Sequence, residues 1–558
     1  MTGNRRVLVI GLDGATLDLA RPWAEAGYLP TFRRLLQEGA WGELTTVIPP
    51  ITGPAWSSFL TGMNPGKHGL YDFMRLAPGT YNIQPINATQ RAGESLWSRL
   101  SRAGKRVIVL NVPAIYPPEP VNGVLVTGMM TPPQAPVFTH PPALGEELAS
   151  ALGGYDVWPA EVFHPQGRER QMIDALSRLT MQTERALTYL QHRVPDWDFC
   201  MAVFMATDTV QHFAWHFMDI SHPRHPAHVP ADLRDAILRA YQGMDAVLAR
   251  LLSQMDGRTL LIVMSDHGFG PLEKYLYINT WLLEAGFLRL RNHPVTRLKY
   301  LLNRLGFTPV AVYDLLMHLG LGAQIGRTVR ARKREVRRGL SALFLSFADV
   351  DWSRTRAYSL GNVGQLYVNL RGRVSRGFVE PGDEYERTIA EIIAALDAWH
   401  DPATGQKIVG RVYRREELFH GERATHAPDL FIMPADLRYQ AFGEYQFPSR
   451  TWLSRAHDRS GAHRLNGLLM LAGEGARHGV RLEGTSIMDL APTILAALGV
   501  PIPPEMDGRV LLEAFTEGVL APVTASGAES SPARAEATLT AEEEAAVREH
   551  LKGLGYLG

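Results

Sequence analysis

Short apolar runs that alternate with helical patterns are the sequence feature that most constrains the fold of this chain. Each run leads into a polar, Gly or Pro turn, as buried strands do. The runs are residues 7–10, 106–110, 124–127, 200–205, 259–264, 430–433 and 467–471, and helical patterns cover 30–38, 95–103, 170–191, 231–255, 384–398 and 486–498. This alternation predicts an α/β fold with a mainly parallel central sheet and helices on both faces.

Ligands of such sheets bind beyond the carboxyl ends of the strands, so the residues that follow each run matter most. These are Asp13 after 7–10, Asp208 and His212 after 200–205, and Asp266 and His267 after 259–264, while His463 lies just ahead of 467–471. A lone aspartate after a strand is more often a helix cap than a metal ligand. Together, however, these residues form the oxygen and nitrogen donor set of zinc-like ions and indicate a metal site.

Thr52 lies in a proline-rich turn, Ile48-Pro-Pro-Ile-Thr52-Gly-Pro54, directly ahead of a predicted helix. At a helix N-terminus its hydroxyl would face the positive end of the helix dipole, and free backbone N–H groups could hold a phosphoryl anion. A threonine at this place is also an ordinary helix cap. Without the metal residues, the cap would be the favoured interpretation.

The order of these residues resembles the alkaline phosphatase superfamily, in particular its type I phosphodiesterase/nucleotide pyrophosphatase family. The pattern is Asp13, Thr52 in its turn, His68-Gly69, Asp208-x-x-x-His212, Asp266-His267-Gly268 and Gly461-x-His463, followed by Asp489-Leu-Ala-Pro-Thr493 and Pro503-Pro-Glu-Met-Asp-Gly508. The resemblance covers about residues 5–515. It implies an alkaline-phosphatase-like α/β fold with an inserted cap region.

The resemblance also implies two divalent metal ions beside a threonine nucleophile. Asp13, Thr52, Asp266 and His267 would hold one ion, and Asp208, His212 and His463 the other. Zinc is favoured and manganese is the alternative, because the histidines disfavour magnesium and calcium. The implied activity is metal-dependent hydrolysis of phosphoesters, and of phosphodiesters in particular, through a covalent phospho-threonine. The alternatives are a phosphoryl-group transferase or phosphomutase on the same scaffold and a metal-free binding protein.

Two departures from known patterns bear on the substrate. Nucleotide pyrophosphatases carry an asparagine five residues after the histidine of the His-Gly motif, and Phe73, preceded by Asp72, stands there in this chain. Sulfatases of the superfamily use C/S-x-P-x-R, whereas this chain has Thr52-Gly-Pro-Ala-Trp56. We expect Gly53, Trp56, Asp72 and Phe73 to contact a small-molecule phosphoester, and the aromatic pair suits an apolar substituent of a diester.

The chain is expected to divide into a catalytic domain in two parts, an insert and a tail. The expected boundaries are 1–289 and 351–515 for the catalytic domain, 290–350 for a basic helical cap, 516–538 for a flexible linker and 539–558 for a helix. The basic segment 327–338 is either a solvated face or a contact for an anionic partner or a membrane surface. Thr540 and Glu543 form a capping box for the last helix, which is expected to end near Gly553.

Bulk composition excludes some classes of function. Lys+Arg and Asp+Glu are both 57, so nothing in the net charge indicates a nucleic-acid partner. The single cysteine, Cys200, excludes an intramolecular disulfide framework and is expected to be a buried thiol. The chain has no apolar stretch of about 18 residues for a membrane span. The run 7–10 is too short for a secretory signal, so a cytoplasmic location is expected.

Overall fold

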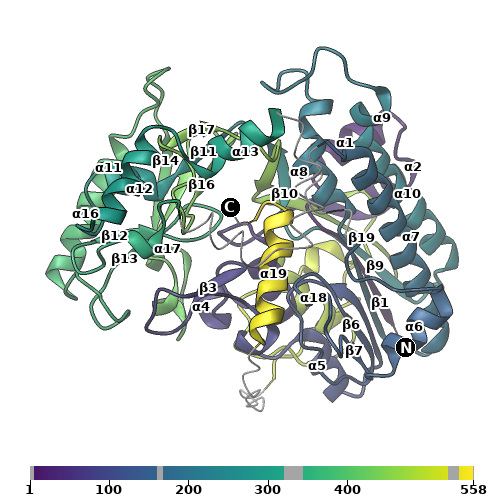
Figure 1. Ribbon diagram of the computed structural model, residues 1–558. Coiled ribbons are helices and arrows are strands. Elements are labelled where there is room, and N and C mark those ends of the chain that lie inside the picture. The colour runs from purple at the N-terminus through teal and green to yellow at the C-terminus, as the bar shows by residue number, and fades with distance from the viewer. Residues whose placement is uncertain (1–4, 160–161, 163–166, 319–342, 526–538, 557–558) are drawn as a thin grey trace.

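The computed structural model describes residues 5–159, 162, 167–318, 343–525 and 539–556. Within these residues the largest layer is a nine-stranded sheet with the order β20-β2-β19-β9-β1-β8-β5-β6-β7 (Figure 1). Its strands are β1 (Arg6–Leu12), β2 (Ala40–Thr45), β5 (Val107–Val112), β6 (Gly123–Thr127), β7 (Thr139–His140), β8 (Phe199–Phe204), β9 (Thr259–Met264), β19 (Asn466–Gly473) and β20 (Val480–Ser486). Strand β19 runs antiparallel to β2 and β9, and β7 to β6, while the other neighbours are parallel. The predicted mainly parallel sheet is confirmed.

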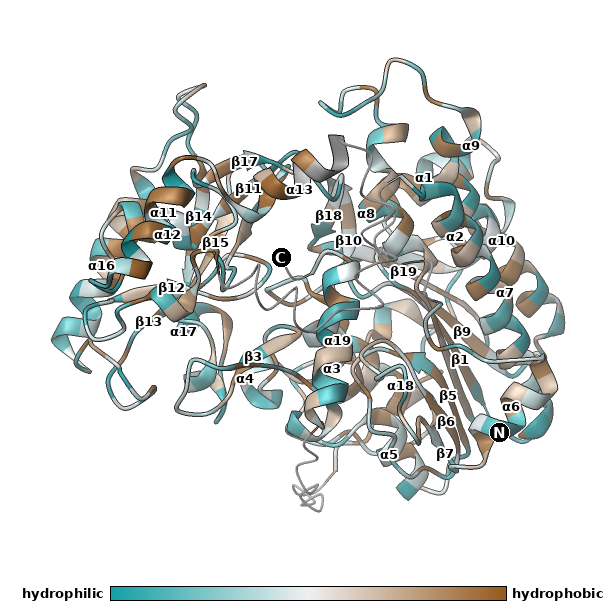
Figure 2. Ribbon diagram, viewed as in Figure 1, coloured by the Kyte–Doolittle hydropathy of each residue, from teal (hydrophilic) through white to brown (hydrophobic). Residues whose placement is uncertain are grey.

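The central strands β1, β8 and β9 are apolar along almost their whole length because both faces of the sheet are covered. One face packs on α1 (Leu17–Glu25), α2 (Pro30–Glu38), α6 (Leu144–Leu152), α7 (Glu169–Arg193), α8 (Ala206–Met218) and α10 (Ala236–Gln254). The other packs on α3 (Thr52–Thr61), α5 (Leu96–Arg102), α18 (Leu490–Ala497) and α19 (Ala541–Gly553). Figure 2 shows the resulting pattern, with hydrophobic strands between helices that turn polar residues outward.

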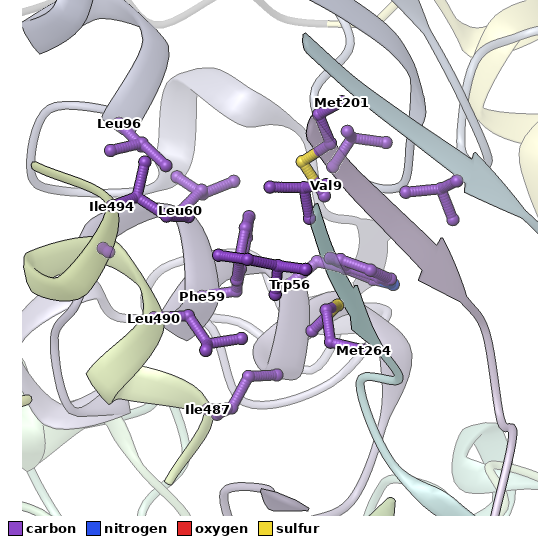
Figure 3. Packing of buried hydrophobic residues seen from close by; sticks show 14 of the residues in the cluster. Val9, Trp56, Phe59, Leu60, Leu96, Met201, Met264, Ile487, Leu490 and Ile494 are labelled. Atoms are coloured by element: carbon purple, nitrogen blue, oxygen red, sulfur yellow. The ribbon is translucent and has the colours of Figure 1, made fainter. Parts of the chain in front are cut away.

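Successive residues of a strand point alternately into the two cores. Val9 and Met201 point to the α3 side and pack with Trp56 and Leu60 (Figure 3). Cys200, one position before Met201, points to the opposite core and is fully buried. Burial raises the pKa of the Cys200 thiol to about 12, so it is an inert core thiol, as expected.

A second lobe follows β9 and carries its own core and two smaller sheets. Its strands are β11 (Lys274–Tyr277), β12 (Ala357–Ser359), β13 (Gln365–Val368), β14 (Val409–Arg414), β15 (Leu430–Pro434), β16 (Tyr439–Phe442) and β17 (Leu453–Arg455), and its helices include α11 (Ile278–Glu284), α12 (Pro294–Arg304), α13 (Pro309–His318), α16 (Asp383–Asp397) and α17 (Arg415–Leu418). The buried members of this core run from Leu276 to Phe447. The lobe therefore extends on both sides of the insert expected at 290–350, and the basic segment 327–338 lies outside the described residues.

The predicted helix near the end of the chain is α19, and its capping box is confirmed. The Thr540 hydroxyl accepts from the Glu543 N–H, and the Glu543 carboxylate accepts from the Thr540 N–H. Figure 1 shows this helix between the two lobes. Across the described ranges, no helix combines the length and the apolar character that crossing a membrane requires.

Candidate metal centre and active site

The predicted ligand residues meet at one edge of the central sheet. Asp13 directly follows β1, Asp208 lies in the first turn of α8 after β8, and Asp266 and His267 follow β9. These three strands are neighbours in parallel register, so their carboxyl ends place the side chains together. His463 arrives from β18 (Gly461–Arg464), which pairs with β10 (Gly268–Pro271) immediately after His267.

Asp208, His212 and His463 form one buried group of donors. The Nε2 atoms of the two histidines are 3.0 Å apart, and Asp208 Oδ1 lies 3.4 Å from His212 Nε2 and 3.2 Å from His463 Nε2. Donors about 2.1 Å from one tetrahedral zinc ion lie about 3.4 Å from each other. The three atoms therefore have the spacing of three ligands of a single ion.

A second group lies beside the first. His267 Nε2 is 3.3 Å from Asp266 Oδ2, 3.7 Å from Asp13 Oδ1 and 3.3 Å from the Thr52 hydroxyl. The rings of His267 and His463 stack with centroids 3.6 Å apart, which joins the two groups. The structure thus brings all seven predicted ligand residues into one cluster, with Asp208 close enough to Asp13 and His267 to share an ion with them.

Hydrogen bonds to backbone carbonyls determine the protonation of all three histidines. The Nδ1 atoms of His212, His267 and His463 lie 3.0, 3.1 and 2.8 Å from the carbonyl oxygens of Gly461, Gly268 and Pro50. A carbonyl can only accept a hydrogen bond, so each Nδ1 carries the proton. Each Nε2 then faces the cluster, where a neutral imidazole directs its lone pair to a metal ion.

The carboxylate oxygens of the cluster face these histidine nitrogens. Asp13 Oδ1, Asp208 Oδ1 and Asp266 Oδ2 are buried, and none has a hydrogen-bond partner among the described residues. They face the lone pairs of the histidines, so acceptor opposes acceptor across a few ångströms. Buried polar atoms of this kind are costly unless a partner satisfies them. A divalent cation between them is the partner that fits this donor set.

Burial disfavours the charged forms of two aspartates and two histidines of the cluster. Burial raises the pKa of Asp13 and of Asp266 well above the usual range, and neighbouring carboxylates raise both further. Burial also lowers the pKa of His212 to about 4 and that of His267 well below its usual value. These two imidazoles are therefore neutral, and a bound cation would stabilise the neighbouring carboxylates in the charged form.

Thr52 is the first residue of α3, and its hydroxyl does not cap the helix. The N-cap residue is Ile51, which offers no side-chain hydrogen bond, and the Thr52 hydroxyl contacts His267 instead. Thr52 is fully buried. Its position at the positive end of a ten-residue helix, against the metal-type donors, favours a chemical role over a cap.

The four predicted substrate contacts occupy different surroundings. Trp56 has no exposed surface, lies in the core and donates its indole N–H to Asp13 Oδ2 at 2.9 Å, so it holds a ligand residue in place (Figure 3). Gly53 and Phe73 are buried against each other and against Ile86. Of the four, only Asp72 lines the cavity described next.

A cavity of about 840 Å³ lies between the second lobe, the hairpin of β3 (Met74–Leu76) and β4 (Ile83–Pro85), and helix α19. Aromatic side chains from the hairpin and the second lobe line it: Tyr81, Phe347, Trp352, Phe442 and Tyr445. Asp72 lies in its wall and accepts hydrogen bonds from Asn362 and Gln365. Asn362 also lines the cavity, so it is an amide residue near the position where the family's asparagine is absent.

Tyr556, which no sequence signal identified, is both a cavity residue and a contact of the metal-type cluster. Its hydroxyl lies 3.2 Å from Asp208 Oδ2, 3.1 Å from His212 Nε2 and 3.2 Å from His463 Nε2. The sequence indicated only a short helix ahead of it. The contact joins residues 348 positions apart and depends on where α19 packs.

Glu444, in the wall of the same cavity, gives a prediction about pH. Burial raises its pKa from 4.5 to about 7, and the charge of Lys552 opposes this shift. The folded chain therefore retains a proton that the unfolded chain releases near pH 4.5, so stability is present below that pH and is lost as the pH rises through about 7. Because Glu444 is partly exposed, we expect a loss of about 1–2 kcal/mol rather than the full shift.

The measurement is the melting temperature of wild type and of Glu444→Gln between pH 5 and pH 8. The two proteins should be similar at pH 5, and the variant should be the more stable at pH 8. Replacement of the exposed Glu422 by glutamine is the control and should show no such divergence. A difference between Glu444→Gln and wild type that stays constant over this range would contradict the prediction.

The fold and the cluster define a class of protein: a mainly parallel α/β sheet that carries a buried Asp/His donor set beside a helix-terminal threonine. A family model described as type I phosphodiesterase/nucleotide pyrophosphatase matches residues 7–463. The chain belongs to this family, within the alkaline phosphatase superfamily, as its residue pattern implied. It is a hydrolase of phosphoric ester bonds.

Solved structures show the same fold at low sequence identity. Phosphonoacetate hydrolase from Sinorhizobium meliloti 1021, in complex with phosphonoacetate, aligns with a TM-score of 0.51 and 14% identity over 89% of this chain and 96% of that chain. A mutant of alkaline phosphatase PafA aligns with a TM-score of 0.50 and 13% identity over 92% of this chain and 100% of that chain. No curated protein sequence matches this chain.

Proposed function

We propose that this chain is a phosphodiesterase that requires two divalent metal ions, zinc in the first place, and uses Thr52 as its nucleophile. One observation carries the proposal. The Nε2 atoms of three histidines and three unpartnered carboxylate oxygens converge beside the Thr52 hydroxyl among the described residues. Asp13, Thr52, Asp266 and His267 would hold one ion, and Asp208, His212 and His463 the other. When bound, the ions would lower the pKa of the attacking hydroxyl and neutralise charge on the phosphoryl group and the leaving oxygen.

The chain's own residues supply the rest of the chemistry. Thr52 attacks phosphorus, loses its proton and expels the first alcohol, which leaves a phospho-threonine ester that water then hydrolyses. The N-terminus of α3 directs free N–H groups towards the phosphoryl oxygens. Trp56 keeps Asp13 in position through its indole N–H, so the geometry is set before substrate arrives.

The cavity supports a diester as the substrate. Its volume and its aromatic lining suit a large organic substituent on phosphorus. The sequence has no basic residue from Thr52 until Lys67, and the Asp72 carboxyl would disfavour a second negative charge. The segment that carries the nucleophile therefore offers a monoester dianion no additional cation.

The test compares kcat/KM for bis-p-nitrophenyl phosphate and p-nitrophenyl phosphate on the zinc-loaded enzyme at one pH. We expect the diester to be favoured by about tenfold or more, which is about 1.4 kcal/mol in transition-state terms. Turnover without any added alcohol acceptor separates hydrolysis from phosphoryl transfer. A tenfold preference for the monoester would instead show that another cation completes the site.

A further inference from the structure

The catalytic cluster is closed off from solvent by the segment that contains α19. Thr52, Asp13 and His267 have no exposed surface, and Asp208 is only 2% exposed. Between this cluster and the cavity stands Tyr556, which is itself 3% exposed and contacts both. This side chain therefore separates the Thr52 hydroxyl from the cavity.

The Tyr556 hydroxyl occupies a defined position in the cluster. It lies 3.1 and 3.2 Å from the Nε2 atoms of His212 and His463, which are themselves 3.0 Å apart, and 3.2 Å from Asp208 Oδ2. These are the separations between neighbouring corners of a tetrahedral metal site, about 3.4 Å. Beside the two histidine nitrogens the hydroxyl therefore stands at the distance of a further ligand, where a substrate oxygen belongs.

The surroundings of the Tyr556 ring fit an anion. The guanidinium of Arg459 lies 5.7 Å from the centre of this ring, and its Nη2 is buried without a hydrogen-bond partner in the described part of the chain. Burial lowers the pKa of Arg459, but neighbouring hydroxyl and carboxyl groups raise it above the ordinary value, so its charge is retained. A phosphoryl group at this place would give the arginine the partner that the tyrosine ring does not.

The turn before Tyr556 brings the backbone close to the Arg459 side chain. Gly555 has φ of +80°, and a Cβ added there would lie 2.6 Å from Cδ of Arg459. Only glycine allows the backbone to pass over the arginine in this conformation. The Tyr556 ring then packs on Phe73 with centroids 4.7 Å apart.

Helix α19 is held on one side by an apolar stripe and on the cavity side by Arg548, which donates to the Ile83 carbonyl of β4. Val547, Leu551 and Leu554 pack into the core on the α3 side of the sheet. The opposite side of the helix faces the cavity, where Ala545 and Arg548 form part of the wall. A short terminal helix held by one apolar stripe and a few polar contacts can leave the cluster while the rest of the fold stays intact.

We propose that residues 540–556 are a movable cover of the active site, in which Tyr556 holds the place of the substrate's phosphoryl group and must leave when substrate binds. The inference deepens the proposed function and rests on it. The segment lies outside residues 7–463, the part of the chain matched by the family. Substrate and Tyr556 therefore compete for one position, and binding of a phosphoryl anion releases the cover.

The first test is calorimetric titration of the zinc-loaded chain with inorganic phosphate. Tyr556→Phe removes the hydroxyl and keeps the ring on Phe73, so phosphate should bind about tenfold more tightly than to wild type. Tyr189→Phe is the control, because the Tyr189 hydroxyl on α7 contacts Glu147 of α6 and neither the cluster nor the cover. Equal or weaker binding by Tyr556→Phe, or no binding by either protein, would overturn the proposal.

The second test is hydrogen exchange of the wild-type chain with and without saturating phosphate. The amides of 541–556 should exchange faster when phosphate is bound, and unchanged or slower exchange would contradict a movable cover. Failure of the proposed function is distinguishable from failure of this inference. A chain that passes both phosphate tests but hydrolyses no diester keeps the cover and loses the phosphodiesterase assignment.

Discussion

Replacement of Thr52 by alanine is expected to lower kcat for diester hydrolysis by about 10³-fold or more, with the fold and the bound metal retained. The hydroxyl is the group that contacts His267 within the cluster, and no other described hydroxyl takes that place. Because it caps no helix hydrogen bond, its removal should cost less than the roughly 1 kcal/mol of a lost cap. Kinetics, metal content and melting temperature of the same preparation provide the measurement.

Two further variants make this test specific. Thr61→Ala removes another buried threonine of α3, whose hydroxyl bonds to the Ser57 carbonyl, and should leave kcat within a few-fold of wild type. Thr52→Ser keeps a nucleophilic hydroxyl and should retain a measurable part of the rate. If Thr52→Ala turned over at close to the wild-type rate, Thr52 would be a structural residue and the nucleophile would lie elsewhere.

Removal of metal should have the second large effect. We expect two zinc ions per chain, loss of about 10³-fold or more in turnover after chelation, and recovery when zinc is returned. The stripped protein should also melt about 5 °C lower, because each of the two ions, at a hundredfold excess over Kd, contributes about 2.7 kcal/mol to stability. Elemental analysis, activity and thermal melting are measured on the same samples.

Two histidine variants test which residues hold the metal ions. His463→Ala should lose about one of the two ions, because His463 Nε2 is a donor of only one of the two ligand groups proposed here. His192→Ala, on the exposed end of α7 and bonded to the Thr188 carbonyl, should keep both. Full activity in thoroughly metal-free protein would contradict the two-metal proposal.

Local sequence patterns were sufficient to predict the strands that carry the site and the aspartates at their ends. Continuous apolar runs predicted the central strands, and the rule that ligands bind at the carboxyl ends of parallel strands predicted that Asp13, Asp208 and Asp266 would meet. The capping box of α19 was predictable for the same reason, since it depends on two residues three positions apart. Such features depend either on the residues of one segment or on a general rule about parallel sheets.

Contacts between distant segments were not predictable in this way. The aromatic character of Trp56 suggested a pocket wall, but the register of α3 on the sheet places it in the core, where it holds Asp13. The expected insert at 290–350 has no local signal for its edges, because the second core also recruits Leu276 before it and Phe447 after it. Hydrophobic burial is non-directional, so composition alone does not say which core a residue joins.

The sequence by itself thus determined the α/β class, the family and the donor set, because each depends on residue type and spacing along the chain. Only the tertiary structure decided how the site is closed. Tyr556 reaches Asp208 across 348 positions of sequence because α19 docks on the α3 side of the sheet through Val547, Leu551 and Leu554. That docking depends on complementary shape and apolar surface between distant segments. No local sequence pattern in either segment predicts it.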